Sequence, residues 1–484
     1  MKIKLTKDKR GEFMTNSISK ENKNYNTVVI AGVFLLGAFV AFLNSTFMNV
    51  AIPDIMTDLK ISVSTAQWLS TGYMLVLGIM IPFTAFLIDR FKTRTLFFMS
   101  MGLFTAGTVL GAFATNFDTL LAARLIQAAG AGVIMPLMQT VFLIIFPKEK
   151  RGFAMGIVGI VIAFAPAIGP TLSGWIINSH PWRDLFYVTL PIAIIDLILG
   201  FILLKNVTDN KKVSLDILSV ITSILGFGGL LLGTSNAGND GFGSVNVYVP
   251  IIVGVIGLAI FVWRQLTMEK PMLNLRVFKS RVFTFSTIIV MVVYAGLISS
   301  ELMIPMYLQQ ARGYSAMNAG LVLMPGAIVM GIMNPITGRL FDKIGARLLS
   351  IIGLIIFTGG TLAFMFLSPS TSEFYIMFMY ALRFFGIAMF LMPLTTSGLN
   401  TLDRSLYSHG NAVNNTMRQI AGAIGTSILI TLMTKVATNS GIMNPEKALI
   451  HGMNVTFACA GILGIISLIV AIFTVKKKEK KAAN

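Results

Sequence analysis

The feature that most constrains this chain is a series of long segments without a charged residue. Five of them, 24–53, 61–88, 152–182, 217–239 and 314–338, contain no Lys, Arg, Asp or Glu. A helix needs about 20 apolar residues to cross the hydrocarbon core of a bilayer. The chain is therefore expected to be an all-α polytopic membrane protein.

Composition leaves no room for a soluble domain. Of the 484 residues, 55% are hydrophobic and only 12% are charged, which excludes an ordinary soluble protein. The longest hydrophilic runs are the first 26 residues and a few loops, too short to bury a core of their own. The first apolar run ends in FMNVAIPDI rather than in a small-residue cleavage pattern, so we interpret it as a retained span.

Apolar runs bounded by charges or by Pro, Gly and Asn turns predict fourteen transmembrane helices. They are expected near 28–52, 64–88, 95–115, 119–145, 153–177, 184–204, 216–236, 246–264, 283–308, 316–338, 346–367, 374–398, 408–433 and 452–475.

The positions of Lys and Arg support this count, because cytoplasmic loops carry an excess of both. Of the 38, 30 lie in one set of alternate loops and tails: 2–23, 90–94, 148–151, 205–212, 264–281, 339–347, 404 and 476–481. The other set holds five, and three lie inside spans. The asymmetry predicts an even number of spans with both termini in the cytoplasm. The net charge of +18 thus sits at membrane edges and does not indicate a nucleic-acid partner.

An internal repeat divides the chain. FLIDRFKTR (86–94) and RLFDKIGAR (339–347) match at an offset of 253, and Pro82 and Pro335 keep that offset. NVAIP (49–53) recurs as ELMIP (301–305), and Arg124 followed by MPL recurs as Arg383 followed by MPL. Spans 1–6 therefore repeat as spans 9–14 in the same orientation. A parallel repeat of two six-helix halves is the plan of the major facilitator superfamily.

The repeat predicts the domain organisation. A cytoplasmic tail (1–26) precedes the first six-helix bundle (27–205), and two extra spans with a linker (206–281) precede the second bundle (282–475). The chain ends in a basic cytoplasmic tail (476–484), which is expected to contact anionic lipid headgroups.

Six motifs in order resemble the fourteen-span drug:proton antiporters of that superfamily, the EmrB/QacA type. They are LNSTFMNVAIP (43–53), AQWLSTGYMLVLGIMIP (66–82), ARLIQAAGAG (123–132), APAIGPTLSGW (165–175), KPMLNLRVFKSRVF (270–283) and HGNAVNNTMRQIAGAIG (409–425). Among the branches of this family, the chain is most similar to the lincomycin-type efflux proteins of Gram-positive bacteria.

The resemblance implies a multi-pass transporter of a bacterial cell membrane that exchanges drugs for protons by alternating access. It also implies a cavity lined mainly by spans 1, 4, 9 and 12. Small hydrophobic or cationic molecules, protons and lipids are the expected partners, the proton gradient replaces any cofactor, and a monomer is expected. The alternative is an exporter of an endogenous metabolite, lipid, siderophore or signalling molecule that works in the same way. The family often carries Asp at the place of Asn44, which is a departure here.

Two acidic residues lie within spans, where a charge is costly and suggests function. Glu301 is the first candidate for proton coupling, because a carboxyl in low dielectric can change its protonation near neutral pH. The alternative is that Glu301 is a permanent partner of an arginine and only fixes helix packing. Asp196 is a second coupling candidate, with a snorkelling or locally bonded carboxyl as the alternative.

Three arginines also lie within spans. Arg124 has Gln127 three residues on, and it resembles the family arginine that senses protonation; the alternative is a capped arginine near the outer interface. Arg383 and Arg418 are candidates for the substrate cavity. In span 13, Asn411 and Asn415 continue with Arg418, Gly422 and Gly425 as one stripe, which would either bind substrate or join two helices. Asn44 and Asn49 of the first-span signature complete the cavity candidates.

Two further motifs concern movement. On span 5, Gly152, Gly156 and Gly159 form a small-residue face that leads into Pro166, Gly169, Pro170 and Gly174. The resemblance associates this motif with export, whereas ordinary helix packing is the alternative. The loop residues Asp89, Arg90 and Arg94, with their repeat equivalents Asp342, Lys343 and Arg347, are gating candidates, since charge pairs there can clasp helices in one state.

Other classes of protein lack their required residues. The three histidines, His180, His409 and His451, lie far apart without metal-binding or catalytic spacing, so neither a metal site nor an enzyme is expected. The chain has no GxxxxGK[ST] loop for an ATP-driven pump. Its single cysteine, Cys459, excludes an internal disulfide.

Overall fold

The computed structural model describes residues 25–208, 213, 215–241 and 243–475. Within these ranges, fourteen helices are long and apolar enough to cross a membrane, as predicted. They are α1 (Thr27–Leu59), α2 (Val63–Arg90), α3 (Thr93–Ala112), α4 (Phe117–Ile145), α5 (Arg151–Ile177), α6 (Asp184–Leu203), α7 (Ile217–Asp240), α8 (Val245–Thr267), α9 (Arg281–Met306), α10 (Ala316–Ile344), α11 (Ala346–Ala363), α12 (Glu373–Asn400), α13 (Tyr407–Asn439) and α14 (Pro445–Thr474). Apart from residues 25 and 26, the two predicted tails lie outside the described residues.

Several helices begin at a residue whose side chain satisfies a free backbone N–H group. Asn26 accepts hydrogen bonds from the N–H groups of Val28 and Val29 at the start of α1. Ser62, Asn116, Asp216, Ser244, Ser280, Ser315 and Asn444 play the same part for α2, α4, α7, α8, α9, α10 and α14. A side-chain oxygen at this position is the preferred helix N-cap.

Several predicted helix ends were wrong by five or more residues. α1 continues through Pro53 to Leu59 instead of ending at 52, and it stops at Lys60, whose backbone is left-handed with φ 52°. α13 continues to Asn439 rather than 433, and α14 begins at Pro445 rather than 452. The prediction ended each helix where the apolar run ended. Backbone hydrogen bonds continue into polar sequence beyond the membrane, so apolar length and helix length differ.

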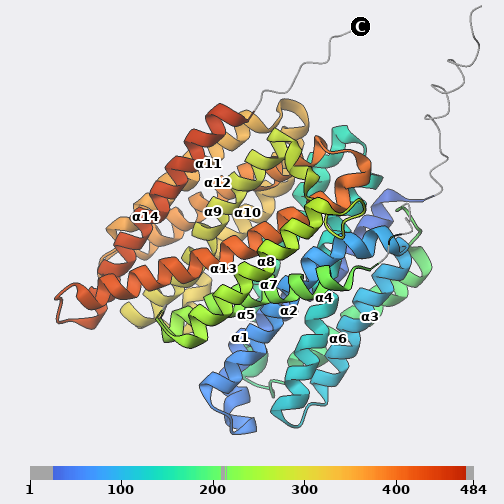
Figure 1. Cartoon of the computed structure of the whole chain (residues 1–484). Coiled ribbons are helices and arrows are strands. Elements are labelled where there is room, and N and C mark those ends of the chain that lie inside the picture. The colour runs from blue at the N-terminus through green and yellow to red at the C-terminus, as the bar shows by residue number, and fades with distance from the viewer. Residues whose placement is uncertain (1–24, 209–212, 214, 242, 476–484) are drawn as a thin grey trace, which may run out of the picture.

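Helices α1–α6 pack on one another in the pattern that α9–α14 repeat. α1 packs on α5 as α9 does on α13, and α3 packs on α6 as α11 does on α14. We call α1–α6 the N-terminal half and α9–α14 the C-terminal half, and the two lie side by side (Figure 1). α1 begins and α14 ends at the same end of the bundle, as an even number of spans requires. This end carries the Lys- and Arg-rich loops, and we call it the cytoplasmic end.

α4 and α12 form the interior of their halves. Both are buried on nearly all sides, including their arginines Arg124 and Arg383. α7 and α8 form a hairpin outside this repeat, with α7 against α2 and α13. Polar groups within spans face the interior of the protein, because lipid offers them no hydrogen-bond partner.

Close helix packing in the N-terminal half depends on glycine at particular positions. A Cβ atom on Gly130 of α4 would lie 2.2 Å from the Ser100 carbonyl oxygen of α3, whereas a Cβ on Gly102 of α3 would meet nothing within 4 Å. We expect Gly130→Ala to destabilise the protein by about 1–3 kcal/mol through overpacking. Gly102→Ala, the matched control, should be neutral or slightly stabilising. Thermal unfolding of both purified variants measures the difference, and equal midpoints would contradict this packing.

Candidate functional site

The N-terminal half contains a buried polar cluster around Arg124. The Nη1 group of Arg124 donates to Asn44 Oδ1 at 2.6 Å and to Gln127 Oε1 at 2.9 Å. The Gln127 amide in turn donates to Thr108 Oγ1 of α3 at 2.9 Å. The guanidinium lies over the ring of Tyr73 from α2, with its Cζ 4.1 Å from the ring centroid. One arginine thus connects α1, α2 and α4, and Gln127 extends the cluster to α3.

All hydrogen-bond acceptors of Arg124 are neutral side chains. The arginine is fully buried, and its Nε lacks a hydrogen-bond partner among the described residues. Its burial and its hydrogen bonds to Asn44 and Gln127 fit both the sensing role and the alternative of a capped arginine, so both stay predictions. Buried and bonded in this way, Arg124 holds four helices of one half together, while it has no titratable hydrogen-bond partner. Asn49 lies in α1, but its side chain is outside the described residues.

The C-terminal half places Arg383 of α12 in a related position. Its Nε donates to Thr361 Oγ1 of α11 at 3.0 Å, and its guanidinium lies near the rings of Phe357 and Phe364. Both terminal nitrogens are buried without a hydrogen-bond partner in the described part of the chain. Arg383 thus has fewer polar partners than Arg124 and leaves donors available.

Glu301 of α9 is the acidic residue whose charge acts on the Arg383 guanidinium. It lies near the outer end of α9 and is half-buried. Its charge is within electrostatic range of the Arg383 guanidinium and the Tyr380 hydroxyl of α12. Within the described ranges, the carboxylate has no ion pair within 4.0 Å and no hydrogen bond. The Glu301 carboxylate thus interacts with the arginine through its charge and is not tied to it by a hydrogen bond or ion pair among the described residues.

Two structural alternatives were considered for Asp196 of α6, a snorkelling carboxyl and a locally bonded one. Asp196 neither snorkels to an interface nor bonds a nearby group. The side chain is fully buried, and both carboxylate oxygens lack a hydrogen-bond partner among the described residues. It packs against Gly37 of α1, where an added Cβ would lie 2.5 Å from Asp196 Oδ2.

The polar stripe of α13 crosses between the two halves. Asn411 donates to Thr140 Oγ1 at 3.1 Å, and Asn415 donates to Gln139 Oε1 at 2.6 Å, both on α4. Arg418 donates to Asn415 and lies 5.7 Å from the ring centroid of Tyr294 on α9. In this conformation the stripe joins helices of opposite halves, which is the second of the two uses considered from sequence.

The second-half loop motif also bridges the halves. The Asp342 carboxylate at the end of α10 accepts hydrogen bonds from the N–H groups of Gly152 (2.8 Å) and Phe153 (2.9 Å), which begin α5. A carboxylate at a helix N-terminus satisfies free donors and complements the helix dipole. Arg151 of α5 donates to Asn400 Oδ1 and to the Tyr407 hydroxyl, at 3.0 and 2.9 Å. These bonds close the two halves against each other at the cytoplasmic end.

The first-half copy of the motif uses other partners. Ser408 of α13 donates to Asp89 at 2.9 Å, and His409 Nε2 lies 3.4 Å from the second Asp89 oxygen. The Nδ1 atom of His409 accepts a hydrogen bond from the backbone N–H of Asn274, in the linker after the inserted spans. Each aspartate thus contacts the first turn of a helix of the opposite half, Asp342 through backbone N–H groups of α5 and Asp89 through a hydroxyl of α13.

The basic residues of the loop motifs act within their own halves. Arg94 donates to the Phe201 carbonyl at the end of α6, and Arg347 donates to the Ile472 carbonyl at the end of α14. Arg90 and Lys343 are exposed. Basic side chains near the last carbonyls of a helix stabilise its C-terminus.

The span 5 motif faces two different helices. Toward the cytoplasmic end, Gly152 and Gly156 lie against α10, where added Cβ atoms would be 2.4 Å from backbone oxygens. Further along, Gly169 lies against Thr46 of α1, while Gly174 has open space around it. Pro170 is exposed, and the side chain of Pro166 lies outside the described residues.

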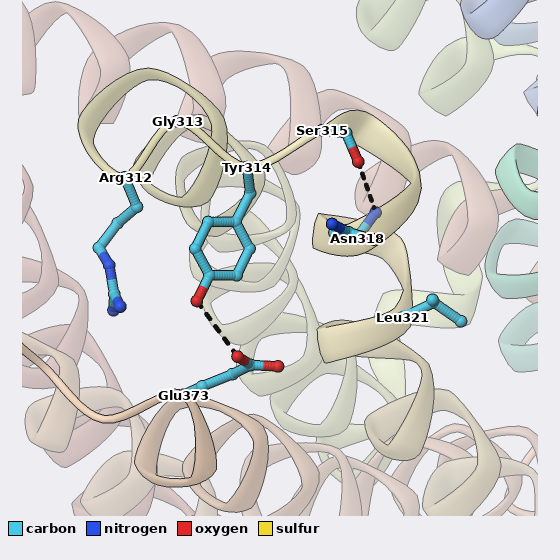
Figure 2. A pocket seen from close by; sticks show the side chains of 7 residues that line it. All are labelled: Arg312, Gly313, Tyr314, Ser315, Asn318, Leu321 and Glu373. Carbon is cyan, nitrogen blue, oxygen red and sulfur yellow. Dashed lines mark hydrogen bonds between the residues drawn. The ribbon is translucent and has the colours of Figure 1, made fainter.

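A separate pocket of about 500 Å³ opens at the outer end of the C-terminal half (Figure 2). It lies between the α9–α10 loop and the start of α12, and Tyr314 donates to Glu373 there at 3.1 Å. Arg312 also lines the pocket. None of the residues selected from sequence lines it.

The structure adds residues that the sequence argument did not select, above all Thr108, Thr361, Gln139 and Tyr73. A signal for two of them was present. Gly107–Thr108 recurs as Gly360–Thr361 at the offset of 253 that the loop motifs share. Uncharged partners of this kind do not stand out, because Thr occurs in most of the spans.

Comparison with known proteins identifies the class of this arrangement. The family model of the Major Facilitator Superfamily matches residues 34–426. The chain belongs to this superfamily, whose members are membrane transport proteins rather than enzymes. It is accordingly a multi-pass transporter of the cell membrane.

Individual relatives match nearly the whole chain. The MFS-type transporter YcnB of Bacillus subtilis (strain 168) is 51% identical over 464 residues, 96% of this chain and 98% of the relative. The lincomycin resistance protein LmrB of the same organism is 42% identical over 470 residues, 95% of this chain and 98% of the relative. A solved structure of a double-Trp mutant of XylE has a TM-score of 0.67 at 14% identity, with 93% of this chain and 96% of that chain covered. The predicted superfamily fold and the resemblance to the lincomycin-type branch are thereby confirmed.

The Asp342 contact yields a prediction about the cytoplasmic closure. In a protein with Cys459 replaced by Ser and Thr140 by Cys, we expect Asp342→Ala to increase labelling of the new cysteine by a charged thiol reagent several-fold. The reason is that the free N–H groups of α5 lose their carboxylate and the halves separate more often. Lys343→Ala removes the neighbouring exposed charge and should leave labelling unchanged. Equal labelling with and without Asp342 would show that its contact with α5 does not hold the cytoplasmic end closed.

Proposed function

We propose that this transporter exports amphipathic or cationic drugs in exchange for protons, by alternating access between its two halves. The proton gradient drives the exchange, and no cofactor takes part. The observation that carries the proposal is the position of Glu301: a half-buried carboxyl within a span, near Arg383 but bonded to nothing among the described residues.

A carboxylate inside a span is costly, by roughly 2.5–3.5 kcal/mol at the helix centre on insertion scales. The cost is relieved when the group binds a proton or faces a cation. Because Glu301 makes no permanent bond, the proton and a cationic drug can occupy its surroundings in turn. Mutual exclusion at one carboxyl is sufficient for exchange.

Arg383 gives this proton site a structural consequence. While Glu301 is ionised, its charge attracts the guanidinium on α12, whose terminal nitrogens have no other partner among the described residues. Protonation removes that attraction and so changes how strongly α9 and α12 hold together. Ligand binding shifts a conformational equilibrium only through such a difference between states.

The N-terminal half supports the assignment by contrast. Arg124 is bonded to the neutral oxygens of Asn44 and Gln127, so proton binding has no carboxyl to act on within that cluster. Asp196 lies in the same half, but it is enclosed between α6 and α1 rather than beside an arginine. We therefore place coupling in the C-terminal half.

The drug class rests on relatives and composition. The name of LmrB refers to lincomycin, which makes this compound the first cargo to test. The chain holds 29 Met and 36 Phe, side chains that adapt to apolar ligands of varied shape.

The test is proton release from proteoliposomes that contain a pH dye, after addition of lincomycin or ethidium. We expect wild-type protein to release protons and Glu301→Gln to fall to the level of protein-free liposomes, because the amide cannot bind the proton. Glu446→Gln is the control, since Glu446 is exposed at the outer start of α14.

Each result has a distinct meaning. Exchange that survives Glu301→Gln contradicts coupling at this residue, and Asp196→Asn then becomes the next variant. Wild-type protein that responds to no drug contradicts drug export and favours an endogenous cargo.

A further inference from the structure

The two halves meet along two seams on opposite sides of the interface. One seam is formed by α5 and α10, and the other by α2 and α13. When the cytoplasmic end opens, the helices of each seam move apart. Each seam is then a potential side entrance from the inner leaflet of the membrane, unless something covers it.

The inserted hairpin covers the α2–α13 seam. α7 packs against both α2 and α13, one helix from each half. At Gly78 of α2, an added Cβ would lie 2.3 Å from Leu231 of α7 and 3.8 Å from Gln419 of α13, so three helices meet at one residue. α8 packs on α7.

The hairpin is fastened at its cytoplasmic end. Arg264 at the end of α8 makes a two-point ion pair with Asp216 at the start of α7, with N to O distances of 2.6 and 2.7 Å. This guanidinium holds the pKa of the Asp216 carboxyl below its usual range, so the pair persists at physiological pH. A bidentate pair is geometrically specific as well as strong.

The linker closes the same seam from the cytoplasmic side. Its residues Met272, Leu273 and Val277 are buried in one apolar cluster with Ala85 of α2 and Val413 of α13. The backbone N–H of Asn274 also donates to His409 Nδ1 of α13, at 3.1 Å. Both halves therefore bury apolar surface under one segment, and uncovering it costs about 25 cal/mol per Å².

The α5–α10 seam is not covered in this way. A row of α10 side chains is exposed along the length of the helix: Met317, Met324, Ile328, Ile332, Ile336 and Leu340. The inserted hairpin lies at the other seam instead, where α7 packs against α2 and α13, and α8 packs on α7. The exposed row indicates that lipid borders this seam directly.

The α5–α10 contact is closely packed, but one buried group within it favours separation. Toward the cytoplasmic end it consists of backbone packed on backbone, with Gly152 against Gly338 and Gly156 against Asn334. Neither side-chain atom of the Asn334 amide has a hydrogen-bond partner among the described residues, although both are buried. A buried unbonded amide raises the free energy of the closed state by about 1–3 kcal/mol. Opening lets it bond to water or to a ligand.

We propose that cargo enters this transporter from the inner leaflet of the membrane between α5 and α10, and that the inserted spans with their linker keep the α2–α13 side shut. The cargo class is an amphipathic compound dissolved in the membrane, and this part rests on the proposed export function. The two extra spans thus leave only one of the two seams open to the membrane.

Cysteine labelling in lipid nanodiscs tests the route independently of any drug. In a protein with Cys459→Ser and with Asp342→Ala to open the cytoplasmic end, single cysteines replace Asn334 in the α5–α10 seam or Ala85 in the α2–α13 seam. Each is exposed to a membrane-dissolved reagent, pyrene maleimide, and to a charged, water-soluble thiol reagent. Phe164→Cys, which faces Gly331 across the α5–α10 seam, gives a second reading if the Asn334 variant folds poorly. Thr140→Cys labelled from water reports that the cytoplasmic end has opened.

We expect pyrene maleimide to label the cysteines at 334 and 164 at least several-fold faster than the one at 85. Equal rates at both seams would overturn the proposal, as would faster labelling at 85. If the cysteine at 140 reacts but pyrene maleimide reaches neither seam, the entrance is aqueous and the proposal is wrong. Failure of drug export would appear in the proteoliposome assay alone, and would leave this labelling pattern unchanged.

Discussion

The rest of this structure depends on the cost of placing charged and hydrogen-bonding groups where lipid offers them no partner. Three arginines lie within spans, and each is buried in the interior of the protein. Arg124 on α4 and Arg383 on α12 each carry five N–H donors, which need hydrogen-bond partners inside the protein. Arg124 finds neutral oxygens and an aromatic ring, and so holds four helices together. Arg383 finds one hydroxyl and the electrostatic field of a nearby carboxylate.

That difference turns a symmetric architecture into an asymmetric one. The halves repeat in helix packing, in a Gly–Thr pair that contacts Gln127 in the first half and Arg383 in the second, and in their loop motifs. They differ in the chemistry around the arginine, which is neutral in the first half and acidic in the second. They also differ at the cytoplasmic latch, where Asp342 binds a helix N-terminus and Asp89 binds Ser408 beside His409. In the proposed mechanism, one half of the duplicated fold carries the proton chemistry and the other provides rigidity.

The inserted spans add a third asymmetry, at the surface facing lipid. A pair of halves related by a repeat has two equivalent seams, and both would open together in a rocking motion. The hairpin and linker bury apolar surface across one of them, while the other is closely packed and contains the Asn334 amide, which is buried without a hydrogen bond among the described residues. On the proposal made above, the same insertion decides from which side a membrane-dissolved molecule reaches the interior.

The sequence by itself determined the class of fold, the fourteen spans, their orientation and the repeat, because hydropathy, Lys and Arg placement and motif offsets are local or periodic signals. It also selected Arg124, Asp196, Glu301, Arg383 and Arg418, because charges in apolar runs are conspicuous. Only the tertiary structure decided what each one meets. Asp196 is enclosed against Gly37, the α13 stripe bonds to Gln139 and Thr140 of the opposite half, and α7 lies on one seam and not the other. Such partners come from helices far apart in the chain and are mostly uncharged, so packing in three dimensions selects them, and no local pattern marks them.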